Sequence, residues 1–317
     1  MVAPLRIVFF GTPQFAVPSL ERLLVSRHPV VGVVTQPDRP RGRGQAVSNA
    51  PVKALALEHG LPLFQPSRLR DPEVEATLRR WQPDLAAVAA YGKLIPDHLL
   101  ALPRLGMVNV HASLLPKYRG AAPVHRAVMA GETETGVTIM RVIRELDAGG
   151  MFAKAIRPIG PDDTSVEVER DLAALGASLL VDVVDAMAAG MACEEPQDET
   201  QATYAPKLTK EEGLIDWTQP ARAIHDKVRG LHPWPHAYTF VKGTRIIVLR
   251  TRVESSVGDA HQPGLVVQVS REAIHVTAGG GGTIAIEQVQ PEGKRPMSVR
   301  DFLAGHPVLA GTRLGGV

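Results

Sequence analysis

The sequence has a single cysteine, Cys193, which excludes disulfide bonds within the chain and any metal site built from several thiolates. Aromatic residues make up only 4% of the chain, so few rings could stack on nucleobases in a pure RNA-binding protein. No run reaches the ~18 apolar residues of a membrane-spanning helix, and the N-terminus lacks the basic region and cleavage site of a signal peptide. We therefore expect a cytoplasmic protein without a membrane partner.

The net charge is only +2, but it is unevenly distributed. Residues 204–317 carry 14 Lys and Arg against 10 Asp and Glu, together with six of the 11 histidines. A basic C-terminal part suits a polyanionic partner, although ordinary solvated surface explains so small an excess equally well. With 317 residues, 44% of them hydrophobic, the chain is long enough to bury a sizeable core in more than one domain.

The first half of the chain alternates short apolar runs with amphipathic stretches. The apolar runs predict strands of a parallel sheet that is covered on both faces: Leu5–Phe10, Val30–Thr35, Leu85–Ala90 and Met107–Val110. The stretches near or between them predict helices: Val17–Ser26, Ala50–His59, Pro72–Trp81 and Pro123–Gly131. This alternation predicts a doubly wound α/β domain.

The second half changes character. Gly136–Ile143 and Met151–Ile159 predict two strands paired around Asp147, and Val166–Ala189 predicts a long helix with a capping box at Thr164 and Glu167. The polar segment Ala192–Ala205 is typical of a linker. Beyond it, short β-rich runs predict a small barrel with a helix at Ile224–Leu231 and another at Ser298–Ala304; these runs are Arg245–Val253, Gly264–Val269, Ala273–Thr277 and Thr283–Gln288.

Several weaker features have ordinary explanations. The turn after the first strand lacks the G-x-G-x-x-G pattern of dinucleotide-binding proteins, because Pro13 and Ala16 follow Gly11. Prolines between His232 and His236 forbid a regular helix, which favours a rigid loop over a metal pair. The loop Arg39–Gly44 holds three arginines, and either solvated surface or a phosphate-binding loop explains it.

Asn109 and His111 stand two residues apart at the carboxyl end of an apolar strand. The period-two alternation of a strand puts both side chains on one face of the sheet, at the edge where ligands of open α/β sheets bind. An amide donor beside an imidazole suits an oxyanion that develops during acyl transfer, and Asp147 could return alongside His111 to orient it. A hydrogen-bonded structural histidine is the alternative, whereas the absence of a G-x-S-x-G elbow argues against a serine hydrolase.

The segment Asn109–Gly120 reads Asn-x-His-x-Ser-Leu-Leu-Pro-x-x-Arg-Gly, with Asp147 36 residues after His111. It resembles the signature of the formyltetrahydrofolate-dependent formyltransferases. Leu5–Ala16 and Thr35–Gly44 resemble the branch of that family whose acceptor is methionine esterified to initiator tRNA. The segments Tyr204–Leu208 and Ile215–Trp217 resemble the interdomain region of the same branch.

The resemblance implies a Rossmann-like catalytic domain over residues 1–191, a linker over 192–207 and an OB-fold-like, tRNA-binding barrel over 208–317. It implies a catalytic trio of Asn109, His111 and Asp147. The residues implied for folate binding are Ser113, Leu114, Leu115, Pro116, Tyr91, Gly92, Leu94 and Val142. Those implied for tRNA binding are Arg39, Arg41, Arg43 and Lys207.

The implied reaction moves the formyl group of 10-formyltetrahydrofolate to the amine of initiator methionyl-tRNA without a metal ion, and we expect a monomer. Alternatives are a transferase that formylates an amino sugar on a nucleotide, a folate hydrolase and a pure RNA-binding protein. The related glycinamide ribonucleotide transformylases are single domains nearer 200 residues, so the length of this chain argues against that acceptor.

Overall fold

The chain folds as two compact units in a computed structural model that describes residues 2–38, 40–41, 46–47, 49–254 and 262–315. Unit 1 comprises Met1–Pro123, Glu134–Pro158 and Glu169–Ala205, and unit 2 comprises Val124–Thr133, Ile159–Val168 and Pro206–Val317. The units therefore interleave in sequence, whereas the domains expected from the sequence are contiguous. The boundaries of the functional domains stay a prediction.

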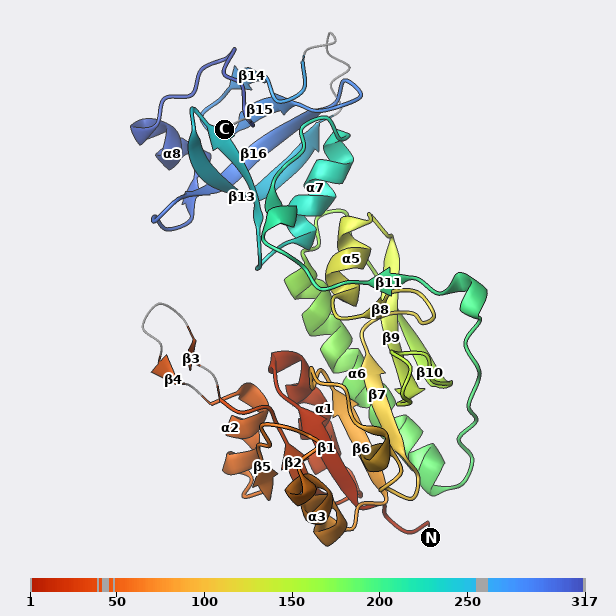
Figure 1. The fold of residues 1–317 in the computed structure, drawn as a ribbon. Helices are drawn as coiled ribbons and strands as arrows, with labels where there is room; N and C mark the ends of the chain where they lie inside the picture. The colour runs from red at the N-terminus through yellow and green to blue at the C-terminus, as the bar shows by residue number, and fades with distance from the viewer. Residues whose placement is uncertain (1, 39, 42–45, 48, 255–261, 316–317) are drawn as a thin grey trace. The chain divides into compact units, whose positions relative to one another are not determined.

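Unit 1 is built on a seven-stranded sheet with the order β10-β9-β7-β6-β1-β2-β5 (Figure 1). Its strands are β1 (Ile7–Gly11), β2 (Val30–Val34), β5 (Leu63–Phe64), β6 (Leu85–Ala89), β7 (Met107–His111), β9 (Glu134–Arg141) and β10 (Met151–Pro158). The strands from β5 to β7 are parallel, and β9 and β10 continue the sheet antiparallel. The predicted α/β class with a mostly parallel sheet is confirmed.

The strand order reverses direction at β1. The chain first adds β2 and β5 on one side of β1 and then places β6 and β7 on its other side. Ligands of such sheets bind outside the carboxyl ends of the strands at this reversal. Those ends carry the residues after β6 and the end of β7, including His111.

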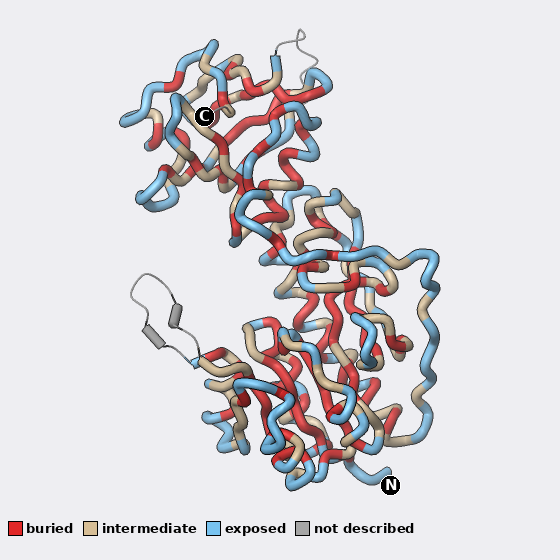
Figure 2. Tube along the Cα trace, viewed as in Figure 1, coloured by how far each residue is buried: buried red, intermediate tan, exposed pale blue. Residues whose placement is uncertain are grey.

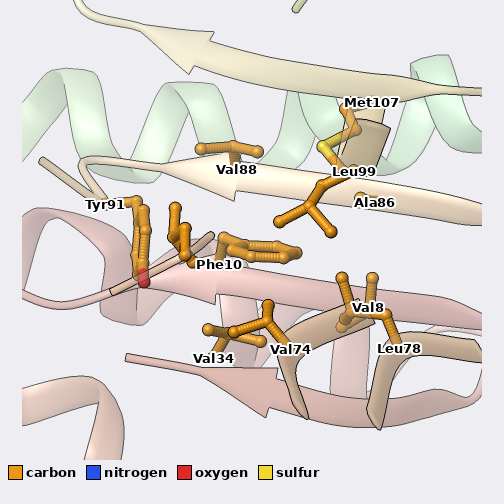
Figure 3. Close-up of a cluster of buried hydrophobic side chains, with 11 residues drawn as sticks. Val8, Phe10, Val34, Val74, Leu78, Ala86, Val88, Tyr91, Leu99 and Met107 are labelled. Atoms are coloured by element: carbon orange, nitrogen blue, oxygen red, sulfur yellow. The ribbon is translucent and has the colours of Figure 1, made fainter. Parts of the chain in front are cut away.

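Both faces of the sheet are covered, because the sequence supplies near-continuous apolar strands. Every residue of β1 and β6 is buried, as the red strands of Figure 2 show. On one face a cluster includes Phe10, Val88 and Met107 and packs on residues of α3 (Pro72–Trp81) and α4 (Asp97–Leu100) (Figure 3). On the other face α6 approaches so closely that a Cβ at Gly176 would lie 2.6 Å from Val110 Cγ1. Since Val110 faces α6, the strand alternation puts Asn109 and His111 on the same face as Met107.

Smaller elements connect this sheet. They are η1 (Gln14–Ala16), α1 (Val17–Leu24), α2 (Pro51–Glu58), the antiparallel pair β3 (Pro40–Arg41) and β4 (Ala46–Val47), the parallel pair β8 (Arg119–Gly120) and β11 (Tyr204–Ala205), and η2 (Glu199–Gln201). Two further helices, α5 (Pro123–Met129) and α6 (Ser165–Ala188), carry residues of both units. In the part of the chain that the structure describes, no helix could cross a membrane, although α6 has 24 residues.

Unit 2 contains a six-stranded antiparallel sheet with the order β12-β13-β16-β15-β14, to which β17 adds beside β16. Its elements are η3 (Glu211–Gly213), α7 (Ala221–Gly230), β12 (Ala237–Val241), β13 (Thr244–Glu254), β14 (Val266–Val269), β15 (Ile274–Thr277), β16 (Thr283–Pro291), β17 (Met297–Ser298) and α8 (Val299–Gly305). The C-terminal segment joins the two edges of the sheet: Leu314 N–H donates to Gly264 O at 2.7 Å, and Gly315 N–H donates to Phe240 O at 3.0 Å. This closure produces the small barrel that the β-rich pattern predicts.

Candidate active site

His111 ends β7 and is buried, and both of its ring nitrogens face acceptors. Nε2 lies 3.0 Å from the Tyr118 carbonyl oxygen. A carbonyl only accepts hydrogen bonds, so Nε2 carries a proton. Nδ1 lies 3.6 Å from Asp147 Oδ2, too far for a direct hydrogen bond and close enough for an ion pair when the ring is charged. The structure thus brings together two of the three residues implied as catalytic, 36 positions apart in the sequence.

The Asp147 carboxylate is held by a loop far away in the sequence. Its Oδ2 accepts a 2.9 Å hydrogen bond from the backbone N–H of Gly120. Asp147 itself has a φ of 48°, in the left-handed region that non-glycine residues rarely adopt. The turn is tight, since a Cβ at Gly149 would lie 2.0 Å from Arg141 O. The carboxylate therefore has a defined place beside the imidazole before any substrate binds.

Asn109 lies two residues before His111 on the same face of β7 and is half-buried. Its side chain makes no hydrogen bond to any residue that the structure describes. A half-buried amide without an internal partner is costly unless a ligand or solvent satisfies it. The amide is therefore available as a donor to a bound group, as the sequence predicts, and its catalytic role stays a prediction.

Two of the segments implied for folate binding reach one buried cluster from opposite ends of the sheet. Tyr91 follows the carboxyl end of β6, whereas Val142 N–H donates to Met107 O at the amino end of β7, at 2.9 Å. Tyr91 is part of the buried cluster of Figure 3, and Val142 packs against that cluster. After Tyr91 in the chain, Gly92 has a φ of 78° and Leu94 leaves 77% of its surface exposed. An exposed leucine next to a buried apolar cluster fits a flat, partly apolar ligand such as a pterin. The folate contacts of these four residues stay a prediction.

The Tyr91 side chain is fully enclosed. Its ring meets the Phe10 ring edge-on at 5.4 Å between centroids. The hydroxyl is buried and has no hydrogen-bond partner among the described residues. Burial raises the pKa of Tyr91 to about 12. If Tyr91 contacts a ligand, it does so through its backbone.

The turn Ser113–Pro116 uses two of its side chains internally. The Ser113 hydroxyl donates to Lys117 O at 2.6 Å, and Leu115 is buried in a cluster with Met140 and Met151. Leu114 lies over β9, where a Cβ at Gly136 would come within 2.3 Å of its Cδ2. Ser113 and Leu115 therefore shape the turn. A folate contact by any of the four residues stays a prediction.

The residues implied for tRNA binding are the least described. Arg39 and Arg43 lie outside the described residues, and Arg41 is described only as backbone in β3. Lys207 is exposed in unit 2. The segment that leads into the arginine loop is anchored, because Gln36 Nε2 donates to Tyr91 O at 2.6 Å.

The sequence did not reveal that residues 194–205, here called the strap, form part of the site. Met151 N–H donates to Glu195 O at 2.7 Å, and Arg119 N–H donates to Thr203 O at 2.8 Å. β11 at the end of the strap pairs with β8, beside which it lies in Figure 1. The strap therefore has the polar composition of a linker, but it pairs with the two loops around His111 and Asp147.

The comparison with known proteins agrees with this geometry. Residues 5–184 match the family model "Formyl transferase", and residues 207–307 match "Formyl transferase, C-terminal domain". The chain belongs to the formyl transferase family. A relative from Methylococcus capsulatus named methionyl-tRNA formyltransferase is 48% identical over 311 residues, which cover 98% of this chain and all of that protein. A relative of the same name from Moorella thermoacetica is 48% identical over 99% of this chain and its own full length.

Solved structures of more distant proteins share the fold of this formyl transferase. An N-formyltransferase from Helicobacter canadensis, in complex with folinic acid and dTDP-3-aminofucose, has a TM-score of 0.68 and 15% identity over 89% of this chain and 99% of its own. HypX from Aquifex aeolicus, in complex with tetrahydrofolic acid, has a TM-score of 0.62 and 18% identity over 95% of this chain and 47% of its own. The Rossmann-like architecture expected for the catalytic part is confirmed.

Proposed function

We propose that this formyl transferase moves the formyl group of 10-formyltetrahydrofolate to the α-amino group of methionine on initiator tRNA. The observation that carries the proposal is the 48% identity, over at least 98% of this chain and the full length of the relatives, to proteins named methionyl-tRNA formyltransferase. The pairing of His111 with Asp147 at the ligand edge of the sheet supports the chemistry.

The folate supplies an activated formyl group on N10, which the methionine amine attacks. Asn109 donates from its amide, which has no partner in the described part of the chain, to the negative oxygen that develops on the formyl carbon. His111 donates to the same oxygen from Nδ1, because its Nε2 proton is held by the Tyr118 carbonyl. Removing one such donor typically costs a factor of ~10²–10³ in rate.

Asp147 stabilises the charged imidazole across 3.6 Å. The Gly120 N–H keeps the carboxylate in that place. The Asp147 carboxylate takes the proton that the amine loses and passes it to N10 of the departing folate, while the charged imidazole keeps both of its own protons and donates to the oxyanion. The imidazole and the carboxylate thus both have positions that are set before substrate binds.

The acceptor is tested by supplying the purified chain with 10-formyltetrahydrofolate and one acceptor at a time. We expect rapid formylation of methionyl initiator tRNA and slow formylation of methionyl elongator tRNA. Preferred transfer to an amino sugar on a nucleotide would identify a sugar formyltransferase instead. Release of formate without any acceptor would identify a hydrolase, and RNA binding without turnover a binding protein.

A further inference from the structure

Gln197, at the centre of the strap, is bonded by both ends of its side-chain amide. Its Nε2 donates to Asp147 O and to Gly149 O, both at 2.8 Å. Its Oε1 accepts from Arg119 Nε at 3.0 Å and from Arg119 Nη2 at 2.8 Å. If the side-chain amide were turned over, Oε1 would face the two backbone carbonyl oxygens and Nε2 would face the two guanidinium donors, and neither contact could be a hydrogen bond. The partners of Gln197 therefore fix the orientation of its amide.

Arg119 is the anchor of this arrangement. It is the largest side chain that the structure buries completely, at 2% exposed. Its remaining donors reach Glu199, at 2.9 Å from Nη1 to Oε2 and 2.7 Å from Nη2 to Oε1. A buried guanidinium needs all of its donors satisfied, so its position is well defined. Gln197 is therefore hydrogen-bonded to a side chain whose position is fixed.

The two loops that bracket the catalytic pair both attach to the strap. The loop with Tyr118 and Gly120 is joined to the strap by the pairing of β8 with β11. In addition, Tyr118 N–H donates to Thr203 Oγ1 at 2.8 Å. The turn with Asp147 is joined to the same strap by Gln197. Asp147 has a left-handed backbone with a φ of 48°, so its turn needs restraint from outside to hold that conformation.

We propose that Gln197 is a positioning residue for formyl transfer, which holds the backbone of Asp147 so that the carboxylate stays beside His111. This inference rests on the proposed function. The side-chain bonds of Gln197 go to the backbone oxygens of Asp147 and Gly149 and to Arg119, so it acts through Asp147. The strap is thereby part of the catalytic apparatus as well as a connection along the chain.

Two substitutions separate the two ends of the amide. Gln197→Ala removes all of its bonds. Gln197→Glu keeps an acceptor for Arg119 but replaces the NH₂ donor by an oxygen facing two carbonyls. We expect both variants to lower kcat by about 10- to 100-fold, with KM for folate and tRNA within about twofold of the wild type. Glu75→Ala, on α3, removes only an exposed ion pair with Arg79 and should leave kcat unchanged.

Whether Gln197 acts through Asp147 is tested by combining Gln197→Ala with Asp147→Asn. Because Gln197 acts through Asp147, Gln197→Ala should lower the single-turnover rate of the Asp147→Asn enzyme by less than about threefold. Full activity of Gln197→Glu would overturn the proposal by assigning Gln197 to Arg119 alone. If both variants instead showed a lower kcat together with a higher KM and a lower melting temperature, Gln197 would have a purely structural role and the proposal would be overturned. An inactive wild type would instead refute the proposed function.

Discussion

The backbone N–H of Gly120 donates a 2.9 Å hydrogen bond to Asp147 Oδ2 across 27 residues of sequence. Gly120 has a φ of 115°, which only glycine adopts readily, and a Cβ there would lie 2.9 Å from Ala205 O. The glycine that ends the Asn109–Gly120 motif is therefore required by its backbone. It directs a donor at the carboxylate that faces His111.

Gly120→Ala should lower kcat by about 10- to 100-fold, because the backbone must shift and move the N–H away from Asp147. The measurement is steady-state formylation together with thermal unfolding. Gly60→Ala is the matched control, since Gly60 has a φ of 62° with open space around its Cβ. That control should lose stability from backbone strain and keep its kcat. Equal activity of the two variants would show that the Gly120 donor is dispensable.

Asn109→Ala should lower kcat by about two to three orders of magnitude through the loss of one donor to the developing oxyanion. Its KM values and melting temperature should change little, because the amide has no partner among the described residues. Asn109→Asp has nearly the same size but presents a negative oxygen, so it should be at least as impaired. A folded Asn109→Ala variant with near-wild-type kcat would remove Asn109 from catalysis.

Tyr91→Phe should leave the free energy of unfolding unchanged or raise it by up to about 1–3 kcal/mol at neutral pH, because the buried hydroxyl has no partner among the residues that the structure describes. Burial raises the pKa of Tyr91 from 10.0 to about 12, so the unfolded chain ionises at a lower pH than the folded one. The wild type should therefore lose stability relative to the variant as the pH rises from 10 to 12. Urea unfolding at several pH values measures this difference. A variant that is less stable at neutral pH would mean that the hydroxyl is satisfied in the native protein.

Arg43→Ala should weaken tRNA binding and leave folate binding unchanged, if the arginine loop contacts phosphates. The dependence of log K on log salt should become shallower by about one unit for each lost phosphate contact. Binding titrations at several salt concentrations measure the slope. Arg79→Ala is a control, because Arg79 pairs with Glu75 on the exposed side of α3. Equal damage to folate and tRNA binding would assign the loop to folding or to the folate site.

The sequence predicted the parts of the fold that depend on local patterns. The predicted strand Met107–Val110 and helix Pro72–Trp81 correspond to β7 and α3, because continuous apolar runs and helical periodicity are local signals. The two-residue strand β5 and the strand β12 were missed, since their places come from pairing with distant strands. The closure of the barrel by Leu314 has the same origin.

The candidate site divides in the same way. Asn109 and His111 were found because polar residues interrupted an apolar strand at its carboxyl end. Gln197 and its bond to Arg119 of the motif were missed, since a glutamine in a polar stretch has no local signal and its partners lie 50 and 78 residues away. The strap was predicted to be a linker because polar residues occur both in segments exposed to solvent and in segments that hydrogen-bond to a neighbouring backbone, so composition alone does not separate the two.

Single-turnover transfer of a labelled formyl group from 10-formyltetrahydrofolate to methionyl initiator tRNA, compared between the wild type and Asp147→Asn, tests the catalytic pair most directly. The asparagine can still accept from Gly120 but carries no charge to stabilise the His111 imidazolium. We expect the wild type to formylate the tRNA and the variant to do so about 10²–10³-fold more slowly, with both substrates bound as tightly as before. Equal rates in a folded variant would contradict the account, as would a wild type that leaves the tRNA unmodified.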